Sequence, residues 1–136
     1  MKIVVDAMGG DHAPEAVVEG AVLAAREYNT KIILTGLTER IQAELDKHDP
    51  DHTLPIEIVH AEQIVEMHDI PGKALRSKKK SSMKVGLDLV KQGVGAAFLS
   101  AGNTGAVLAY STVILRPVKG CLLYTSDAAD DTPCVD

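Results

Sequence analysis

Two strand–loop–helix junctions contain the residues whose types and spacing suit chemistry. In the first, an apolar strand ends at Asp6 and continues into Gly9-Gly10-Asp11-His12. In the second, an apolar stretch ends in Ser100-Ala101-Gly102-Asn103-Thr104-Gly105. In an open α/β sheet, ligands are held in the loops beyond the carboxyl ends of the strands. The two junctions therefore predict a site for an anionic small molecule.

The second junction is the sharper signal. A helix N-terminus offers N–H groups without partners and about half a positive charge, and glycines such as Gly102 and Gly105 let the backbone approach an anion. The side chains of Ser100, Asn103 and Thr104 can add hydrogen bonds. We expect phosphate, or the oxyanion of a reacting carbonyl, to bind here. The alternative is plain helix capping, because Asn and Thr are good N-cap residues.

The first junction is less specific. Asp6 stands at the carboxyl end of the predicted first strand, and Asp11 and His12 are placed to hydrogen-bond a substrate or to orient a loop. The alternative is that Gly9-Gly10 makes a turn and that Asp11 or His12 caps the next helix. The spacing is not the G-x-G-x-x-G dinucleotide pattern. The second predicted strand does not end in an acid that could bind ribose.

A basic run from Lys73 to Lys80 is the third candidate, and it includes Arg76 and Lys78. It is either a solvated charge run or a surface that attracts phosphate or an acidic partner. We expect no nucleic acid partner, because only 3% of the residues are aromatic and could stack on bases. The five histidines show no metal-ligand spacing, so we expect no metal.

Alternating strand and helix patterns must position these residues. Strands are predicted over 2–6, 31–35, 55–60 and 96–100, the last of them buried. Helices are predicted over 14–28, 38–46, 82–93 and 103–113. Between residues 62 and 82 only a chain break at Asp69-Ile70-Pro71-Gly72 is predicted. The alternation predicts an α/β fold with a parallel sheet covered on both faces.

Length and composition set limits. The 136 residues suit one domain with a real core. The chain has neither an apolar run of 18 residues nor a secretory signal, so we expect a cytoplasmic protein. Residues 121–136 continue no earlier pattern and resemble the translation of a sequencing adapter, so we interpret them as a non-native tail. They contain both cysteines, which leaves no thiol chemistry for residues 1–120.

Three ordered motifs resemble the PlsX family of phosphate acyltransferases. They are Val4-Val5-Asp6-Ala7-Met8-Gly9-Gly10-Asp11 with Pro14, Ser81-Ser82-Met83, and Ser100-Ala101-Gly102-Asn103-Thr104-Gly105-Ala106. The resemblance extends over residues 1–120, and family members are considerably longer. We therefore expect 1–120 to be the N-terminal part of a single domain, and this piece to be inactive by itself.

The resemblance implies an enzyme that makes acyl phosphate from long-chain acyl-acyl carrier protein and inorganic phosphate for phospholipid synthesis, without a cofactor. It also implies a three-layer α/β/α fold like that of isocitrate and isopropylmalate dehydrogenases. A homodimer, peripheral contact with the inner face of the bacterial membrane, and glycerol-3-phosphate acyltransferase as a partner are further implications. The alternatives are a phosphotransacetylase-like enzyme that uses coenzyme A and a non-catalytic anion-binding α/β module.

The resemblance and the motifs together predict the site residues. We expect the catalytic set to be Asp6, Asp11, Asn103 and Thr104. We expect substrate to be bound by Gly9, Gly10, Arg76, Lys78, Ser82, Ser100, Gly102 and Gly105. Because a carboxylate repels phosphate, Asp6 and Asp11 are expected to fix the facing loop or handle protons.

Overall fold

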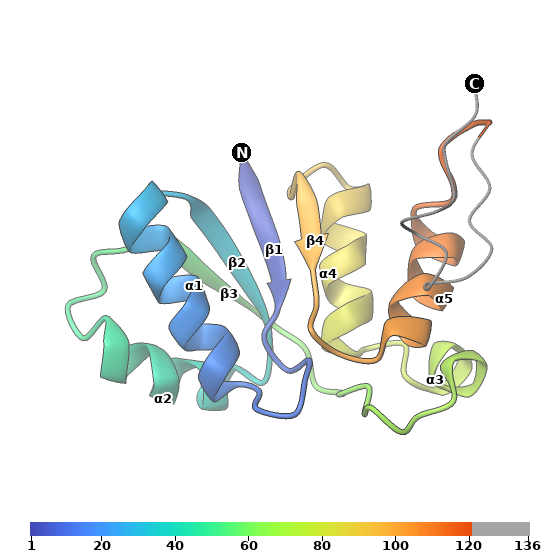
Figure 1. The fold of residues 1–136 in the computed structure, drawn as a ribbon, viewed down its shortest axis with the longest axis horizontal. Coiled ribbons are helices and arrows are strands. Elements are labelled where there is room, and N and C mark those ends of the chain that lie inside the picture. Colours follow the sequence, from blue (N-terminus) through green and yellow to red (C-terminus); the bar gives the residue numbers. More distant parts are fainter. Residues whose placement is uncertain (121–136) are drawn as a thin grey trace.

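Figure 1 shows the computed structural model, which describes residues 1–120 as strands alternating with helices. The predicted tail at 121–136 lies outside the described residues. In chain order the elements are β1 (Lys2–Asp6), α1 (Glu15–Tyr28), β2 (Lys31–Gly36), α2 (Thr38–His48), β3 (Ile56–His60), α3 (Pro71–Ser77), α4 (Ser82–Lys91), β4 (Ala97–Leu99) and α5 (Thr104–Ile114).

The strands form one parallel sheet in the order β3-β2-β1-β4. At its centre Val4 of β1 pairs with Ile33 of β2 on one side and with Phe98 of β4 on the other. Branched and aromatic side chains of this kind favour the pleated, buried surface of a strand. The predicted α/β class and parallel sheet are confirmed.

Helices cover both faces of the sheet. The helices α1 and α2 pack against β2 and β3 on one face, and α4 packs against β1, β2 and β4 on the other. Helix α5 lies outside α4 and also contacts α3, as the right side of Figure 1 shows. One hydrophobic cluster therefore lies under α1 and α2, and a second joins α3, α4 and α5.

The prediction that the fourth strand is buried is wrong for the described residues. There β4 is the last strand of the sheet, and Leu99 is 62% exposed. An edge strand has a neighbour on one side only, so its side chains receive less cover than those of a central strand. Val4 in the adjacent β1 is fully buried.

The start of α1 also differs from the prediction. Pro14 occupies the N-cap position and makes no side-chain cap, so neither Asp11 nor His12 caps this helix. The buried face of α1 includes Val18 and Val22, whereas Tyr28 is 70% exposed. The helix itself was predicted correctly over 14–28 and is observed from Glu15 to Tyr28.

The segment between β3 and α4 contains a short helix that the prediction missed. The Asp69-Ile70-Pro71-Gly72 break is followed directly by α3, with Pro71 in its first turn, where a missing N–H costs nothing. Its buried Ala74 packs into the cluster around Tyr110 of α5. Tertiary contact therefore stabilises a helix too short to form alone.

Candidate functional site

The two predicted junctions meet at one edge of the sheet. From β1 the chain passes outward to β2 and β3, and then crosses back to place β4 on the other side of β1. The helix α1, which follows β1, and the helix α4, which precedes β4, consequently lie on opposite faces of the sheet. Ligands bind at such a reversal of strand order, beyond the carboxyl ends of the strands. Asp6 ends β1 at this place, and Ser100 follows β4.

Asp6 is the buried polar centre of the junction. Its side chain is 2% exposed, and burial raises the pKa of the carboxyl above its ordinary value of 3.8. Hydrogen bonds from the Ser82 and Ser100 hydroxyls and from the Met8 amide act in the opposite direction and stabilise the carboxylate. The Met8 amide donates to Oδ1 at 3.1 Å, and the Ser100 hydroxyl donates to Oδ2 at 3.0 Å.

Ser100 links the two loops. While its hydroxyl donates to Asp6, its Oγ accepts a hydrogen bond from the Gly102 amide at 3.1 Å. The Gly102 amide is thereby used inside the loop. The predicted role of Gly102 in binding an anion through its N–H would therefore require this bond to break.

Glycine is required where the loops touch. A Cβ atom on Gly9 would lie 2.7 Å from Ser100 Oγ and 3.0 Å from the Gly102 nitrogen. A Cβ atom on Gly102 would lie 3.1 Å from Gly9 Cα. Gly10 has a φ of +104°, which other residues rarely adopt. The predicted glycine loops therefore pack backbone against backbone.

The start of α5 lies beside this contact. Asn103 is the N-cap, and its Oδ1 accepts a hydrogen bond from the Ala106 amide at 3.1 Å. The amides of Thr104 and Gly105 have no carbonyl partner within the helix, because the first N–H groups of any helix lack one. Thr104 is exposed. These two amides and the Thr104 hydroxyl are the groups at this junction best placed to meet an anion.

Asn103 has a second task that sequence reasoning missed. Its Nδ2 donates to the carbonyl oxygens of Glu66, Met67 and Asp69 at 3.1, 3.4 and 2.8 Å. Both ends of the amide are thus occupied by the protein backbone. The contacts favour a positioning role for Asn103 over the predicted direct bond to substrate.

Lys78 of the basic run is likewise occupied. Its Nζ lies 2.5 Å from Asp69 Oδ2 and 2.7 Å from the Ile64 carbonyl oxygen. The hydrogen bond from Lys78 is the largest cause that lowers the pKa of the Asp69 carboxyl. Lys78 therefore stabilises the loop before α3, and Arg76 on α3 is the exposed member of the predicted pair.

Two other predicted site residues, Ser82 and Asp11, have different surroundings. Ser82 is 1% exposed, and its carbonyl oxygen accepts a 2.9 Å hydrogen bond from Thr35 Oγ1. It stabilises Asp6 from inside the fold rather than from an open surface. Asp11 is exposed and lines a cavity of about 320 Å³ together with Arg40 and His68, neither of which was among the predicted site residues.

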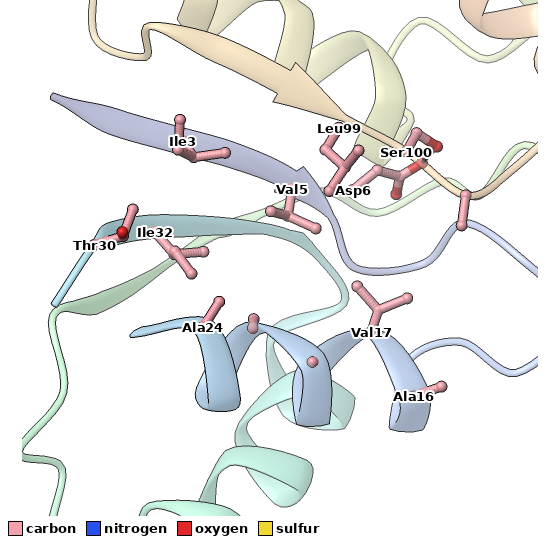
Figure 2. A pocket seen from close by; sticks show the side chains of 13 residues that line it. Ile3, Val5, Asp6, Ala16, Val17, Ala24, Thr30, Ile32, Leu99 and Ser100 are labelled. Atoms are coloured by element: carbon pink, nitrogen blue, oxygen red, sulfur yellow. Dashed lines mark hydrogen bonds between the residues drawn. The ribbon is translucent and has the colours of Figure 1, made fainter. Parts of the chain in front are cut away.

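An apolar cavity of about 560 Å³ adjoins the Asp6–Ser100 pair. It lies between α1 and the sheet, and Figure 2 shows Asp6 and Ser100 together at one end of it, with Thr30 at the other. The helix lines it with the small residues Ala16, Gly20 and Ala24, spaced four apart on one face. That spacing was the sequence signal for this cavity, and the prediction did not use it.

Within residues 1–120, no helix has both the length and the apolar character needed to cross a membrane. In the same part of the chain, no three His, Cys, Asp or Glu side chains gather as ligands for a metal ion.

Comparison with known proteins assigns the chain to a family. The family model described as "Fatty acid synthesis protein" matches residues 1–122. Phosphate acyltransferase of Geobacter sulfurreducens is 50% identical over 120 residues, which are 88% of this chain and 34% of the relative. The phosphate acyltransferase of Clostridioides difficile is 46% identical over 135 residues, 99% of this chain and 37% of the relative. The chain thus spans about a third of the length of the curated relatives it matches.

Proposed function

The chain belongs to the fatty acid synthesis protein family, and from this premise we propose that residues 1–120 are the N-terminal part of a phosphate acyltransferase. The proposed substrates are a long-chain acyl thioester of acyl carrier protein and inorganic phosphate. The proposed product, acyl phosphate, feeds phospholipid synthesis. The observation that carries the proposal is the 50% identity to a phosphate acyltransferase over 120 residues.

The proposed reaction needs positioning and charge stabilisation. A phosphate oxygen attacks the thioester carbonyl carbon, and a tetrahedral oxyanion forms. Its collapse breaks the carbon–sulfur bond, and the thiolate leaves as the free carrier after taking a proton. Phosphate is already anionic near neutral pH, so holding it against the thioester contributes more than deprotonating it.

The residues take the following roles in the proposal. The amides of Thr104 and Gly105 and the Thr104 hydroxyl bind phosphate or the oxyanion at the start of α5. Asp6 and Ser100 hold the two loops in register through their 3.0 Å hydrogen bond. The Asp6 carboxylate is buried and accepts hydrogen bonds from Met8 and Ser100, so in the proposal it holds the loops and does not contact phosphate.

We also propose the wider architecture that the resemblance implies. The sheet with helices on both faces is compatible with a three-layer fold like that of isocitrate and isopropylmalate dehydrogenases. A homodimer, cytoplasmic location, peripheral membrane contact and cooperation with glycerol-3-phosphate acyltransferase belong to the same proposal. They concern the whole protein rather than the described residues.

A chimera tests the function. Residues 1–120 would replace the matching segment of Geobacter sulfurreducens phosphate acyltransferase. We expect phosphate-dependent loss of the thioester from palmitoyl-acyl carrier protein, with acyl phosphate trapped by hydroxylamine. Equal turnover of palmitoyl-coenzyme A would favour the phosphotransacetylase-like alternative. Phosphate binding without turnover, in a chimera as folded as the parent enzyme, would favour the anion-binding module.

A further inference from the structure

The helix α3 and the loop before it form an exposed surface that the site does not use. Two apolar side chains, Met67 and Ile70, are 49% and 57% exposed on the loop. Lys73 and Arg76 follow on α3, and Lys79 comes just after it, all three exposed. We refer to these five residues as the α3 surface.

The cations of the α3 surface point outward by helical geometry. Lys73 and Arg76 are three residues apart and therefore share a face of α3. Between them Ala74 is 3% exposed and packs toward Tyr110. In the basic run, Lys78 pairs with Asp69 and Lys80 pairs with Glu62, whereas no ion pair within residues 1–120 includes Lys73, Arg76 or Lys79. Their charges are available to a partner.

The backbone under this surface is firmly held. Asn103 donates to three carbonyl oxygens between Glu66 and Asp69, and Lys78 bonds both Asp69 and the Ile64 carbonyl. The Tyr110 hydroxyl lies 2.8 Å from the Ala74 carbonyl oxygen and 2.7 Å from that of Lys78. A preorganised surface loses little conformational entropy on binding.

The α3 surface is also close to the candidate site. A Cβ atom on Gly105, in the first turn of α5, would lie 2.8 Å from Pro71 Cγ at the start of α3. Both helices begin at the carboxyl edge of the sheet, at the lower right of Figure 1. A partner seated on α3 would therefore hold its cargo within reach of the Thr104 amide.

We propose that the α3 surface docks an acidic protein that carries the acyl group as a thioester. The inference rests on the proposed function and gives its carrier substrate a location. Carboxylates of the carrier would meet Lys73, Arg76 and Lys79, and an apolar contact would cover Met67 and Ile70. An apolar centre with a charged rim is the usual anatomy of a protein interface. Complementary charge speeds and orients the encounter.

An anionic membrane is the rival occupant, and the surface fits it less well. The helix α3 has 7 residues, and its inner side is committed to α5. Only Met67 and Ile70 are available to enter a lipid layer from this surface. Interfacial helices instead present a continuous apolar face along several turns.

Charge reversal on the 136-residue chain tests the surface. The probe is fluorescently labelled palmitoyl-acyl carrier protein in phosphate-free buffer at low salt, followed by anisotropy. We expect the double variant Lys73→Glu/Arg76→Glu to weaken binding by about tenfold or more and to flatten its salt dependence. The matched control is Lys31→Glu/Lys91→Glu, which changes the net charge equally at the opposite edge of the sheet. We expect the control to change binding less than twofold.

Three outcomes would overturn the inference: no binding by the unsubstituted chain, equal weakening by both double variants, or binding to phosphatidylglycerol vesicles in place of the carrier. The proposed function is judged separately in the chimera with palmitoyl-pantetheine, a thioester that lacks the carrier protein. Turnover of palmitoyl-pantetheine without carrier binding at α3 would leave the function standing and reject the surface. Carrier binding at α3 without any turnover would support the surface and reject the proposed function.

Discussion

The Ser100 hydroxyl donates a 3.0 Å hydrogen bond to Asp6 Oδ2, which joins two residues 94 positions apart in the chain. The bond links the end of β1 to the residue after β4, across the point where the strand order reverses. Ser100 also accepts from the Gly102 amide. One hydroxyl therefore determines how the two glycine loops face each other.

The titration of Asp6 leads to a prediction about Asp6→Asn. Because the pKa of the folded carboxyl lies above 3.8, the folded chain binds more protons than the unfolded chain between 3.8 and that raised value. The free energy of unfolding contributed by Asp6 therefore falls as pH rises through this window. Asparagine does not titrate, so we expect Asp6→Asn to gain stability relative to the parent as pH rises. Urea unfolding of both chains between pH 3.5 and 7 measures the difference, and a gap independent of pH would contradict the prediction.

The contact between the loops predicts the effect of Gly9→Ala. A methyl group at Gly9 would lie 2.7 Å from Ser100 Oγ and force the loops apart. We expect a loss of about 1–3 kcal/mol in unfolding free energy. The control is Gly20→Ala in α1, where an added Cβ meets nothing within 4 Å. There we expect a gain of about 0.5–1 kcal/mol, because alanine favours the helix. Denaturant melts that rank the two variants the other way would refute the proposed loop contact.

The two tasks of Asn103 are separable by substitution. Asn103→Ser retains an oxygen that can cap α5 but loses the donor to the 66–69 loop, whereas Asn103→Ala loses both. We expect faster amide hydrogen exchange at 66–69 in both variants, and fraying of the first turn of α5 in Asn103→Ala alone. The loss of the cap costs about 1 kcal/mol. Unchanged exchange at 66–69 would show that the three carbonyl contacts do not hold the loop.

Lys78 and Lys80 differ in what their ion pairs contribute. The Lys78–Asp69 pair is mostly shielded and includes a backbone carbonyl, so we expect Lys78→Met to cost about 1–3 kcal/mol at neutral pH. The folded pKa of Asp69 is lowered, so this stability is present above pH 3.8 and lost as pH falls through the folded value. Lys80→Met removes an exposed pair and should cost less than about 1 kcal/mol. Equal losses in urea melts at pH 7 would reject the distinction.

Thr104 is predicted to act on the reaction rather than on stability. In the active chimera, we expect Thr104→Ala to lower kcat/KM by roughly tenfold or more, as removal of an oxyanion donor does. Thr104→Ser should recover most of the activity because it keeps the hydroxyl. The control is Thr112→Ala on the same helix, where the hydroxyl donates to the Leu108 carbonyl oxygen. Turnover unaffected by Thr104→Ala would remove Thr104 from the site.

The sequence was sufficient where the signal is local. Runs of branched apolar residues predicted β1, β2 and β3 to within one residue, and the helix predicted over 38–46 ends two residues before the last residue of α2. Asn103 is the N-cap of α5, as in the capping alternative that the sequence left open for this junction. Such signals depend on residues that are close together in the sequence, within a turn or two of a helix or strand.

Prediction failed where contacts between residues far apart in the sequence determine the local structure. The helix α3 exists because Ala74 and the Lys78 carbonyl meet Tyr110, more than 30 positions away. Lys78 was predicted to bind substrate, and no local pattern in the sequence indicates its ion pair with Asp69. Ser82 was predicted to bind substrate, and the fold buries it to 1% exposure, where its side chain hydrogen-bonds Asp6.

The amino-acid order alone determined the strands, most of the helices and the two glycine loops that follow β1 and β4. Tertiary structure alone decided that these loops touch, that Ser100 bonds Asp6, and that Asn103 and Lys78 face the 64–69 loop instead of solvent. The physical reason is that β4 becomes the neighbour of β1 only when the chain crosses the sheet. Hydrogen-bond partners separated by such a crossover leave no periodicity in the sequence.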